Sequence, residues 1–260
     1  MGCTLLGMKK DVSPLRFRDA SSAGFTLVEL AIVLMIIGLL IGGILRGQEL
    51  MENARASATI QQVNAYMGAS VTFQDTYSAP AGDLATALTR VPGCTAANFC
   101  GNGDGNGMIG QLTGHTFSVS QAATNAMPQV ETSYFWKHLA LTHLISGINP
   151  SADPTQPDWG ATHPSAKVGG GFVVFYSRVA ADVGIGHSLK LQLSPTSVGV
   201  SGAANTVISP IRARYIDEKM DDGHPDRGSV QSDSEGSGCD PGGRYAVSEA
   251  AICVMFFKIN

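Results

Sequence analysis

A long apolar segment near the N-terminus constrains this chain more than any other feature. Residues 25–45 read FTLVELAIVLMIIGLLIGGIL and contain two polar side chains, Thr26 and Glu29. As a helix the segment measures about 31 Å at 1.5 Å per residue, and the hydrocarbon core of a bilayer is roughly 30 Å thick. The sequence therefore predicts a single helix that crosses a membrane.

The charges around this segment predict its orientation. The charged residues that precede it are Lys9, Lys10, Asp11, Arg16, Arg18 and Asp19. These charges sum to +2. Because the whole chain has a net charge of −4, the residues that follow carry a net charge of −6. Basic flanks stay in the cytoplasm, so we expect everything after Arg46 to be exported across the inner membrane. The acidic body argues against a nucleic-acid partner.

Small side chains lie before the apolar segment, at Ser21-Ser22-Ala23-Gly24. A secretory signal peptide has its small residues and cleavage site after the apolar stretch, where this chain instead has Leu45-Arg46-Gly47. Cleavage between Gly24 and Phe25 would remove the basic leader and leave the apolar helix on the mature protein.

Glu29 is the unusual residue of the segment. A carboxylate within a membrane helix costs on the order of 2–4 kcal/mol, and such residues usually have a partner. No lysine or arginine occurs between Asp19 and Arg46, and no partner is expected within reach on the same helix. The partner is therefore expected to come from another subunit.

The run Gly24-Phe25-Thr26-Leu27-Val28-Glu29-Leu30 resembles the processing and methylation motif of the type IV pilin and pseudopilin family. The resemblance implies that a prepilin peptidase cuts after Gly24 and N-methylates Phe25. It also implies that an inner-membrane assembly platform adds the chain to other pilin or pseudopilin subunits. Glu29 would then pair with a neighbour's N-terminal amine, because opposite charges attract strongly at low dielectric.

Two features depart from the family pattern. The leader is longer than usual, and translation from Met8 instead of Met1 would give it the ordinary length. The helix has Gly38, Gly42 and Gly43 where the family often has a proline. These glycines either weaken the helix locally or permit close helix packing, and the sequence favours neither.

The rest of the chain predicts an α+β, pilin-like fold with a long helix packed on a small antiparallel sheet with long loops. One helical face continues after the membrane segment, and its members are Ile60, Val63, Tyr66, Phe73 and Tyr77. A short helix is expected over 133–146, with Trp136, Leu139, Ala140 and His143 on its buried side, and another over 210–220. Strands are expected over 171–177, 189–193 and 251–259.

These elements give four expected parts of the chain. They are a leader over 1–24, a transmembrane helix over 25–45, an amphipathic continuation over 46–77 and an exported globular domain over 78–260.

The cysteines agree with cleavage and export. They are Cys3, Cys94, Cys100, Cys239 and Cys253. An odd number is awkward in an exported protein, and cleavage after Gly24 removes one and leaves four. Four cysteines allow three pairings, and pairing neighbours gives Cys94–Cys100 and Cys239–Cys253. A zinc site is disfavoured because there is no CxxC and the two spacings differ.

Two regions have side chains suited to calcium. The run Asn102-Gly-Asp104-Gly-Asn106 looks like half of a calcium loop, but its twelfth position is Thr113, so a glycine turn is favoured. A second cluster consists of Asp217, Asp221, Asp222 and Asp226. Some pseudopilins bind calcium through C-terminal loops, so the resemblance makes this cluster a candidate, with a solvated helix end as the alternative.

Three classes of function remain. The first is a filament subunit, major or minor, of a type IV pilus or of a type II secretion pseudopilus, and Glu29 favours it. The second is a minor pilin at the filament tip that binds a surface, DNA or a secreted substrate. The third is an anchored enzyme, which is disfavoured because the chain has no P-loop and no dinucleotide fingerprint. The sequence therefore predicts a non-enzyme without a cofactor.

Overall fold

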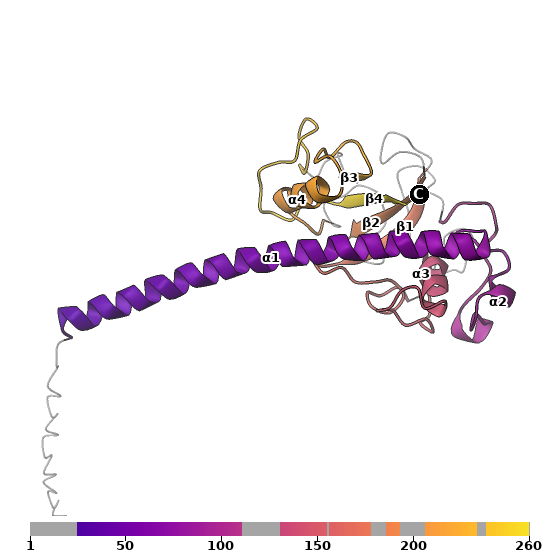
Figure 1. The fold of residues 1–260 in the computed structure, drawn as a ribbon, viewed down its shortest axis with the longest axis horizontal. Coiled ribbons are helices and arrows are strands. Elements are labelled where there is room, and N and C mark those ends of the chain that lie inside the picture. The colour runs from indigo at the N-terminus through magenta and orange to yellow at the C-terminus, as the bar shows by residue number, and fades with distance from the viewer. Residues whose placement is uncertain are drawn as a thin grey trace, which may run out of the picture. The chain divides into compact units, whose positions relative to one another are not determined.

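The computed structural model describes residues 25–110, 131–154, 156–177, 186–192, 206–232 and 238–259 (Figure 1). The predicted leader and Gly24 lie outside the described residues. The chain divides into two compact units, residues 1–47 and residues 48–260, and each is treated by itself.

The helix α1 runs from Leu27 to Tyr77. Among the described residues it is the one helix that is long and apolar enough to cross a membrane, by length and composition alone. In the first unit its large apolar side chains are exposed, and Leu39, for example, is 75% exposed. A Cβ added at Gly38, Gly42 or Gly43 would meet nothing within 4 Å. The first unit therefore offers an apolar surface that its own residues leave uncovered.

In the second unit, the predicted face of α1 packs into the core. Val63, Tyr66 and Phe73 are buried, while Ile60 and Tyr77 are partly buried against the same cluster. The Tyr66 ring lies edge-on to Phe172 of the sheet, with centroids 5.5 Å apart, and to Trp136, with centroids 5.1 Å apart. Figure 1 shows this part of α1 alongside the sheet. The predicted packing of helix on sheet is confirmed.

Four strands form one antiparallel sheet. They are β1 (Gly171–Ser177), β2 (Gly186–Gln192), β3 (Val230–Ser232) and β4 (Met255–Ile259), in the order β1-β2-β4-β3. Register pairs Phe172 with Leu191 and Leu189 with Phe257, so these apolar side chains share the face that joins the main core. The α+β prediction is confirmed.

Several element boundaries differ from the predictions. The last strand begins at Met255 and not at 251, because Cys253 instead exchanges backbone hydrogen bonds with Ile208 and Val207. The third helix, α3, spans Glu131–Leu141, so it begins and ends earlier than predicted. His143 is exposed at φ 59, outside the helix, so its predicted place on the buried side was wrong.

The remaining helices flank this core. They are α2 (Ala87–Arg90), a 3-10 turn over Ala96–Asn98, and α4 (Pro210–Met220). The first two were not predicted, while α4 matches its prediction. Disulfide bonds join Cys94 to Cys100 and Cys239 to Cys253, with Cα atoms 5.1 Å apart in each pair. Of the three pairings that four cysteines allow, this is the one between neighbours in sequence.

Candidate functional site

The first turn of α1 forms a capping box around Glu29. The backbone N–H and the hydroxyl of Thr26 both donate to Glu29 Oε2 at 2.9 Å. In return, the Glu29 N–H donates to Thr26 Oγ1 at 3.2 Å. A threonine followed three residues later by glutamate is the usual sequence of this motif, which satisfies donors that a helix start leaves open. Thr26 therefore fixes both the start of the helix and the direction of the Glu29 side chain.

This geometry corrects one expectation. Glu29 does have a partner on its own helix, because Thr26 lies within hydrogen-bond reach. The two donors are neutral, however, so they leave the carboxylate with its full negative charge. The positive end of the helix dipole offsets only part of that charge. The sequence contains no lysine or arginine over residues 20–45 that can neutralise it.

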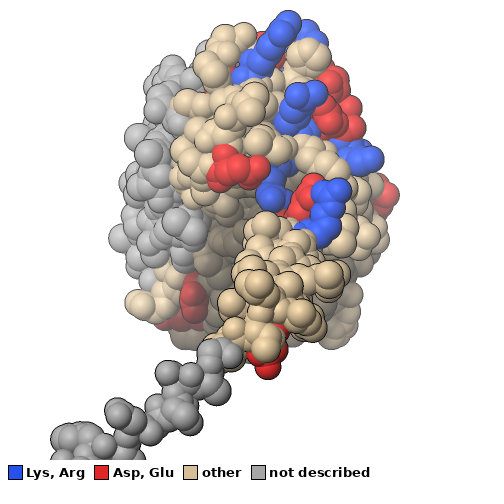
Figure 2. All heavy atoms as spheres, turned by 90° about the vertical axis from the view of Figure 1, so that its left-hand side faces the viewer, with Lys and Arg blue, Asp and Glu red and all other residues tan. Residues whose placement is uncertain are grey.

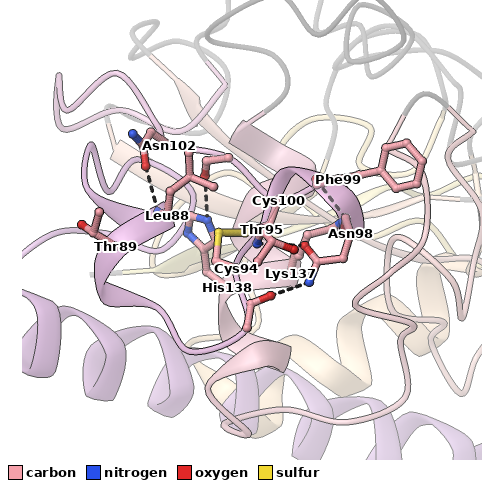
Figure 3. The surroundings of a disulfide bond; sticks show 12 residues. Leu88, Thr89, Cys94, Thr95, Asn98, Phe99, Cys100, Asn102, Lys137 and His138 are labelled. Atoms are coloured by element: carbon pink, nitrogen blue, oxygen red, sulfur yellow. Dashed lines mark hydrogen bonds between the residues drawn. A yellow bond between two sulfur atoms is a disulfide. The ribbon is translucent and has the colours of Figure 1, made fainter.

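A second polar site joins the Cys94–Cys100 disulfide loop to Lys137 and His138 of α3 (Figure 3). The ammonium group of Lys137 is buried and donates to the carbonyl oxygens of Asn98, Phe99 and Ala152 at 2.7, 3.1 and 2.9 Å. Burial lowers the pKa of Lys137 to about 8. Three backbone acceptors satisfy the three donors of the ammonium, so Lys137 fastens the disulfide loop to α3.

His138 lies beside the same disulfide and has a fixed tautomer. Its Nδ1 accepts from the Gly82 N–H at 3.0 Å, so Nε2 carries the proton and donates to the Gly101 carbonyl at 3.1 Å. Burial lowers the pKa of His138 to about 4. The two cysteine sulfurs near His138 are bonded to each other, so this group is a structural cluster and not a zinc site.

The C-terminal acidic cluster lies at the end of α4. Asp217, Asp221 and Asp222 each place a carboxylate oxygen within 4.8 Å of the others, whereas Asp226 is not part of this group. Asp217 is buried and accepts from the Tyr245 hydroxyl at 2.8 Å. Burial raises the pKa of Asp217 to about 6. The cluster can therefore hold a cation, although its oxygens already accept hydrogen bonds from the protein.

Acidic and basic side chains alternate near the start of the second unit. Glu52 pairs with Arg55 at 3.1 Å and lies 3.7 Å from Arg212, and Arg214 pairs with Glu218 at 2.7 Å. Figure 2 shows blue and red side chains next to one another on this face. On the face drawn there, the charges are interspersed and do not form one large basic patch.

Comparison with known families identifies the N-terminal segment. Residues 19–45 match the prokaryotic N-terminal methylation motif. This motif is the signature of type IV pilins and pseudopilins, so the chain carries the signature of a structural, pilin-type subunit. The resemblance expected from Gly24 to Leu30 is thereby confirmed. Neither a curated protein nor a solved structure matches the chain.

The structure also brings together residues that the sequence did not single out. Thr26 was seen as a polar residue and not as a cap, although T-x-x-E is a recognisable signature. No local pattern predicts a role for Asp83 or Glu131, yet both are buried and bind the glycine-rich loop. Their contact joins residues that are far apart in sequence, and no local pattern marks it.

Proposed function

We propose that this chain is a structural subunit of a type IV pilus or a type II secretion pseudopilus. It is made as a membrane-anchored precursor, cut after Gly24 by a prepilin peptidase and N-methylated at Phe25. The mature chain then assembles through α1, with Glu29 paired to the N-terminus of a neighbouring subunit. The observation that carries this proposal is a capped but un-neutralised carboxylate at the start of an apolar helix that bears the methylation motif.

The physical argument concerns what cleavage creates. Before cleavage, the backbone nitrogen of Phe25 is an uncharged amide. Cleavage turns it into an ammonium next to the apolar segment, and an unpaired ammonium is as costly there as an unpaired carboxylate. Two neighbouring subunits can each satisfy the other's charge at low dielectric. Pairing between copies therefore favours addition to a filament over a dispersed anchored monomer.

The same proposal assigns the parts of the chain. The leader (1–24) stays cytoplasmic, the segment 25–45 crosses the inner membrane, the stretch 46–77 continues the helix, and residues 78–260 complete the exported domain. The exposed apolar side chains of α1 in the first unit suit lipid before assembly and other copies of the helix afterwards. The inner-membrane assembly platform is the partner that transfers the subunit between these environments.

The proposal is tested on filaments sheared from cells that produce the chain. We expect mass spectrometry and antibody labelling to find the mature chain along the fibres, and deletion of the prepilin peptidase to remove it from the sheared fraction. A chain that remains wholly in the membrane fraction while other subunits of the same system form fibres would contradict the proposal.

Calcium binding at Asp217, Asp221 and Asp222 stays a prediction. Calcium at about ten times its Kd would stabilise the domain by roughly 1.4 kcal/mol, seen as a higher melting temperature at pH 7.5. Asp221→Asn should remove the increase, whereas Asp153→Asn, outside the cluster, should retain it. An unchanged melting temperature of the wild-type chain at millimolar calcium would remove the prediction.

A further inference from the structure

Two buried carboxylates hold the glycine-rich loop over residues 101–110. Asp83, which is 2% exposed, accepts three backbone hydrogen bonds from this loop. They come from the N–H groups of Gly105 at 2.8 Å, Asn106 at 3.1 Å and Gly107 at 2.9 Å. One aspartate therefore gathers three consecutive amides, so the loop closes around Asp83.

Glu131, the first residue of α3, accepts hydrogen bonds from two positions of the same loop. It is fully buried, and its Oε1 accepts from the Asp104 N–H at 2.9 Å. Its Oε2 accepts from the Gly110 N–H at 3.5 Å. Asp83 and Glu131 together thus bind five backbone amides of the loop, and the two that Glu131 binds are fastened to the start of α3.

The glycines make this close approach possible. A Cβ at Gly103 would lie 2.4 Å from the Cα atom of Asp83, so no larger residue fits. Gly105 and Gly107 have φ values of 76° and 81°, in the left-handed region that glycine adopts without a steric penalty. The run that the sequence showed as a flexible turn is a shaped loop around two acids.

The negative charges of the three acids at this loop have no positive side chain paired with them among the described residues. Asp83, Asp104 and Glu131 place carboxylate oxygens within 4.8 Å of one another. Across the part of the chain that the structure describes, no lysine or arginine forms an ion pair with them. Lys137, on the same helix as Glu131, donates to backbone carbonyl oxygens instead. Three ionised carboxylates at this distance repel one another, so the arrangement favours a bound proton.

Within the described residues, the other titratable or charged side chains facing this region are Tyr134, Arg90 and two histidines. Tyr134 is neutral, because burial raises the pKa of its hydroxyl. Arg90 lines a pocket with Asp83 but donates to the Tyr77 carbonyl at 2.8 Å and not to an acid.

His138 on α3 is neutral, because its Nδ1 accepts from Gly82. His187 on β2 accepts from the Ile109 N–H at 3.3 Å, so it is neutral as well. Neither histidine supplies a positive charge to the three acids.

We propose that Asp83, Asp104 and Glu131 form a proton-dependent latch, in which one shared proton keeps the loop 101–110 closed on α3. Loss of that proton leaves three like charges together and opens the loop. The latch is a property of the globular part of the chain and does not depend on filament assembly, so it can fail or hold independently of the proposed function. It would make the exported domain respond to the pH of its surroundings.

The electrostatics give the pH range. Burial, followed by the charges of Asp104 and Asp83, raises the pKa of Glu131 from 4.5 to about 8. A pKa raised in the folded state means that the folded protein holds the proton more tightly than the unfolded chain. The stabilisation is therefore complete below the unfolded pKa of 4.5 and is lost as the pH rises to about 8.

Other groups also titrate in this range. Burial lowers the pKa values of His138 and His187 to about 4 and that of His163 to about 3, so stability rises with pH until the unfolded-state histidines, with a pKa near 6.5, have lost their protons. Lys137, with a pKa lowered to about 8, also makes stability rise with pH near pH 8. These effects oppose the effect of Glu131, so its contribution is the difference between the wild-type chain and a variant that lacks its carboxyl group.

The test is urea unfolding of the full chain in detergent micelles, followed by the fluorescence of the buried Trp136. From pH 6.5 to pH 8 we expect the unfolding equilibrium constant of the wild-type chain, divided by that of Glu131→Gln, to rise about tenfold, as one linked proton requires. Glu131→Gln keeps the size of the side chain and cannot titrate, so it retains the pH response of the other groups alone. Glu218→Gln, the matched change at an exposed glutamate, should keep the tenfold rise relative to Glu131→Gln.

Hydrogen exchange of the amides of residues 104–107, corrected for intrinsic rates, reports on the loop itself. Their protection should fall at pH 8 in the wild-type chain but not in Glu131→Gln. If Glu131→Gln does not fold, Asp104→Asn serves instead, because removing that charge should reduce the wild-type change. An equal pH response in wild type and Glu131→Gln would overturn the latch. In an Asp221→Asn chain, in which the C-terminal acidic cluster should no longer bind the ion, recovery of the pH 6.5 stability by about 2 mM calcium at pH 8 would also overturn it, since a cation would then replace the proton.

Discussion

A Glu29→Gln chain is expected to enter the membrane and be processed normally, but to yield at least about tenfold fewer filaments. Glutamine is itself a capping-box residue, so its side chain can still accept from Thr26 and keep the start of α1 in place. The substitution therefore removes the charge and leaves the cap. A hydrogen bond to a charged group is worth about 1.5–3 kcal/mol, which is roughly ten- to hundredfold in the affinity between subunits.

Two controls separate charge from helix capping. Glu49→Gln makes the same chemical change on α1 beyond the apolar segment and should assemble like wild type. Thr26→Val removes the cap, at a cost of about 1 kcal/mol, but retains the carboxylate. Filament yield is measured as sheared protein per cell, with the mature chain in the membrane as the reference. A wild-type yield from Glu29→Gln would show that assembly does not use the charge.

Gly24→Val is expected to leave the precursor uncut in the membrane, with no mature chain and no filaments. Small residues precede the cleavage point from Ser21 to Gly24, and a β-branched side chain there hinders the close approach of a protease to the backbone. The uncut chain also keeps the Phe25 nitrogen in a peptide bond, so no ammonium is available to Glu29 of a neighbour. Intact-mass measurement of the membrane fraction distinguishes the two forms.

Ser22→Ala provides the matched control for this prediction, since it changes a nearby leader residue without adding bulk. It should be processed and assembled like the wild-type chain. A mature Gly24→Val chain that starts at Phe25 would show that another feature directs the cut.

Features that depend on local sequence were predicted closely. The strand β1 (Gly171–Ser177) was expected at its observed bounds, because a run of valine and aromatic residues bounded by glycine identifies it. The helix α4 follows from Ser209-Pro210, where proline suits the first helical position. The apolar segment and its match to the methylation motif were predicted as well, because both are contiguous in sequence.

Other features, which depend on distant contacts without a local pattern, were not predicted. The strand β3 has three residues, and only its pairing with β4 makes it a strand. Glu131 would have been assigned to a solvated helix start, since nothing near it in sequence shows that Asp83 and the loop 101–110 enclose it. Polar residues buried by tertiary structure carry no periodic pattern, so a single sequence does not identify them.

The N-terminal residue of the chain in purified filaments tests the central claim most directly. Peptide mass spectrometry should find a first residue Phe25, heavier by one methyl group, with Glu29 unmodified in the same peptide. A native chain that begins upstream of Phe25 would contradict the account, because its N-terminal amine would lie in the leader and the Phe25 nitrogen would have no charge to offer.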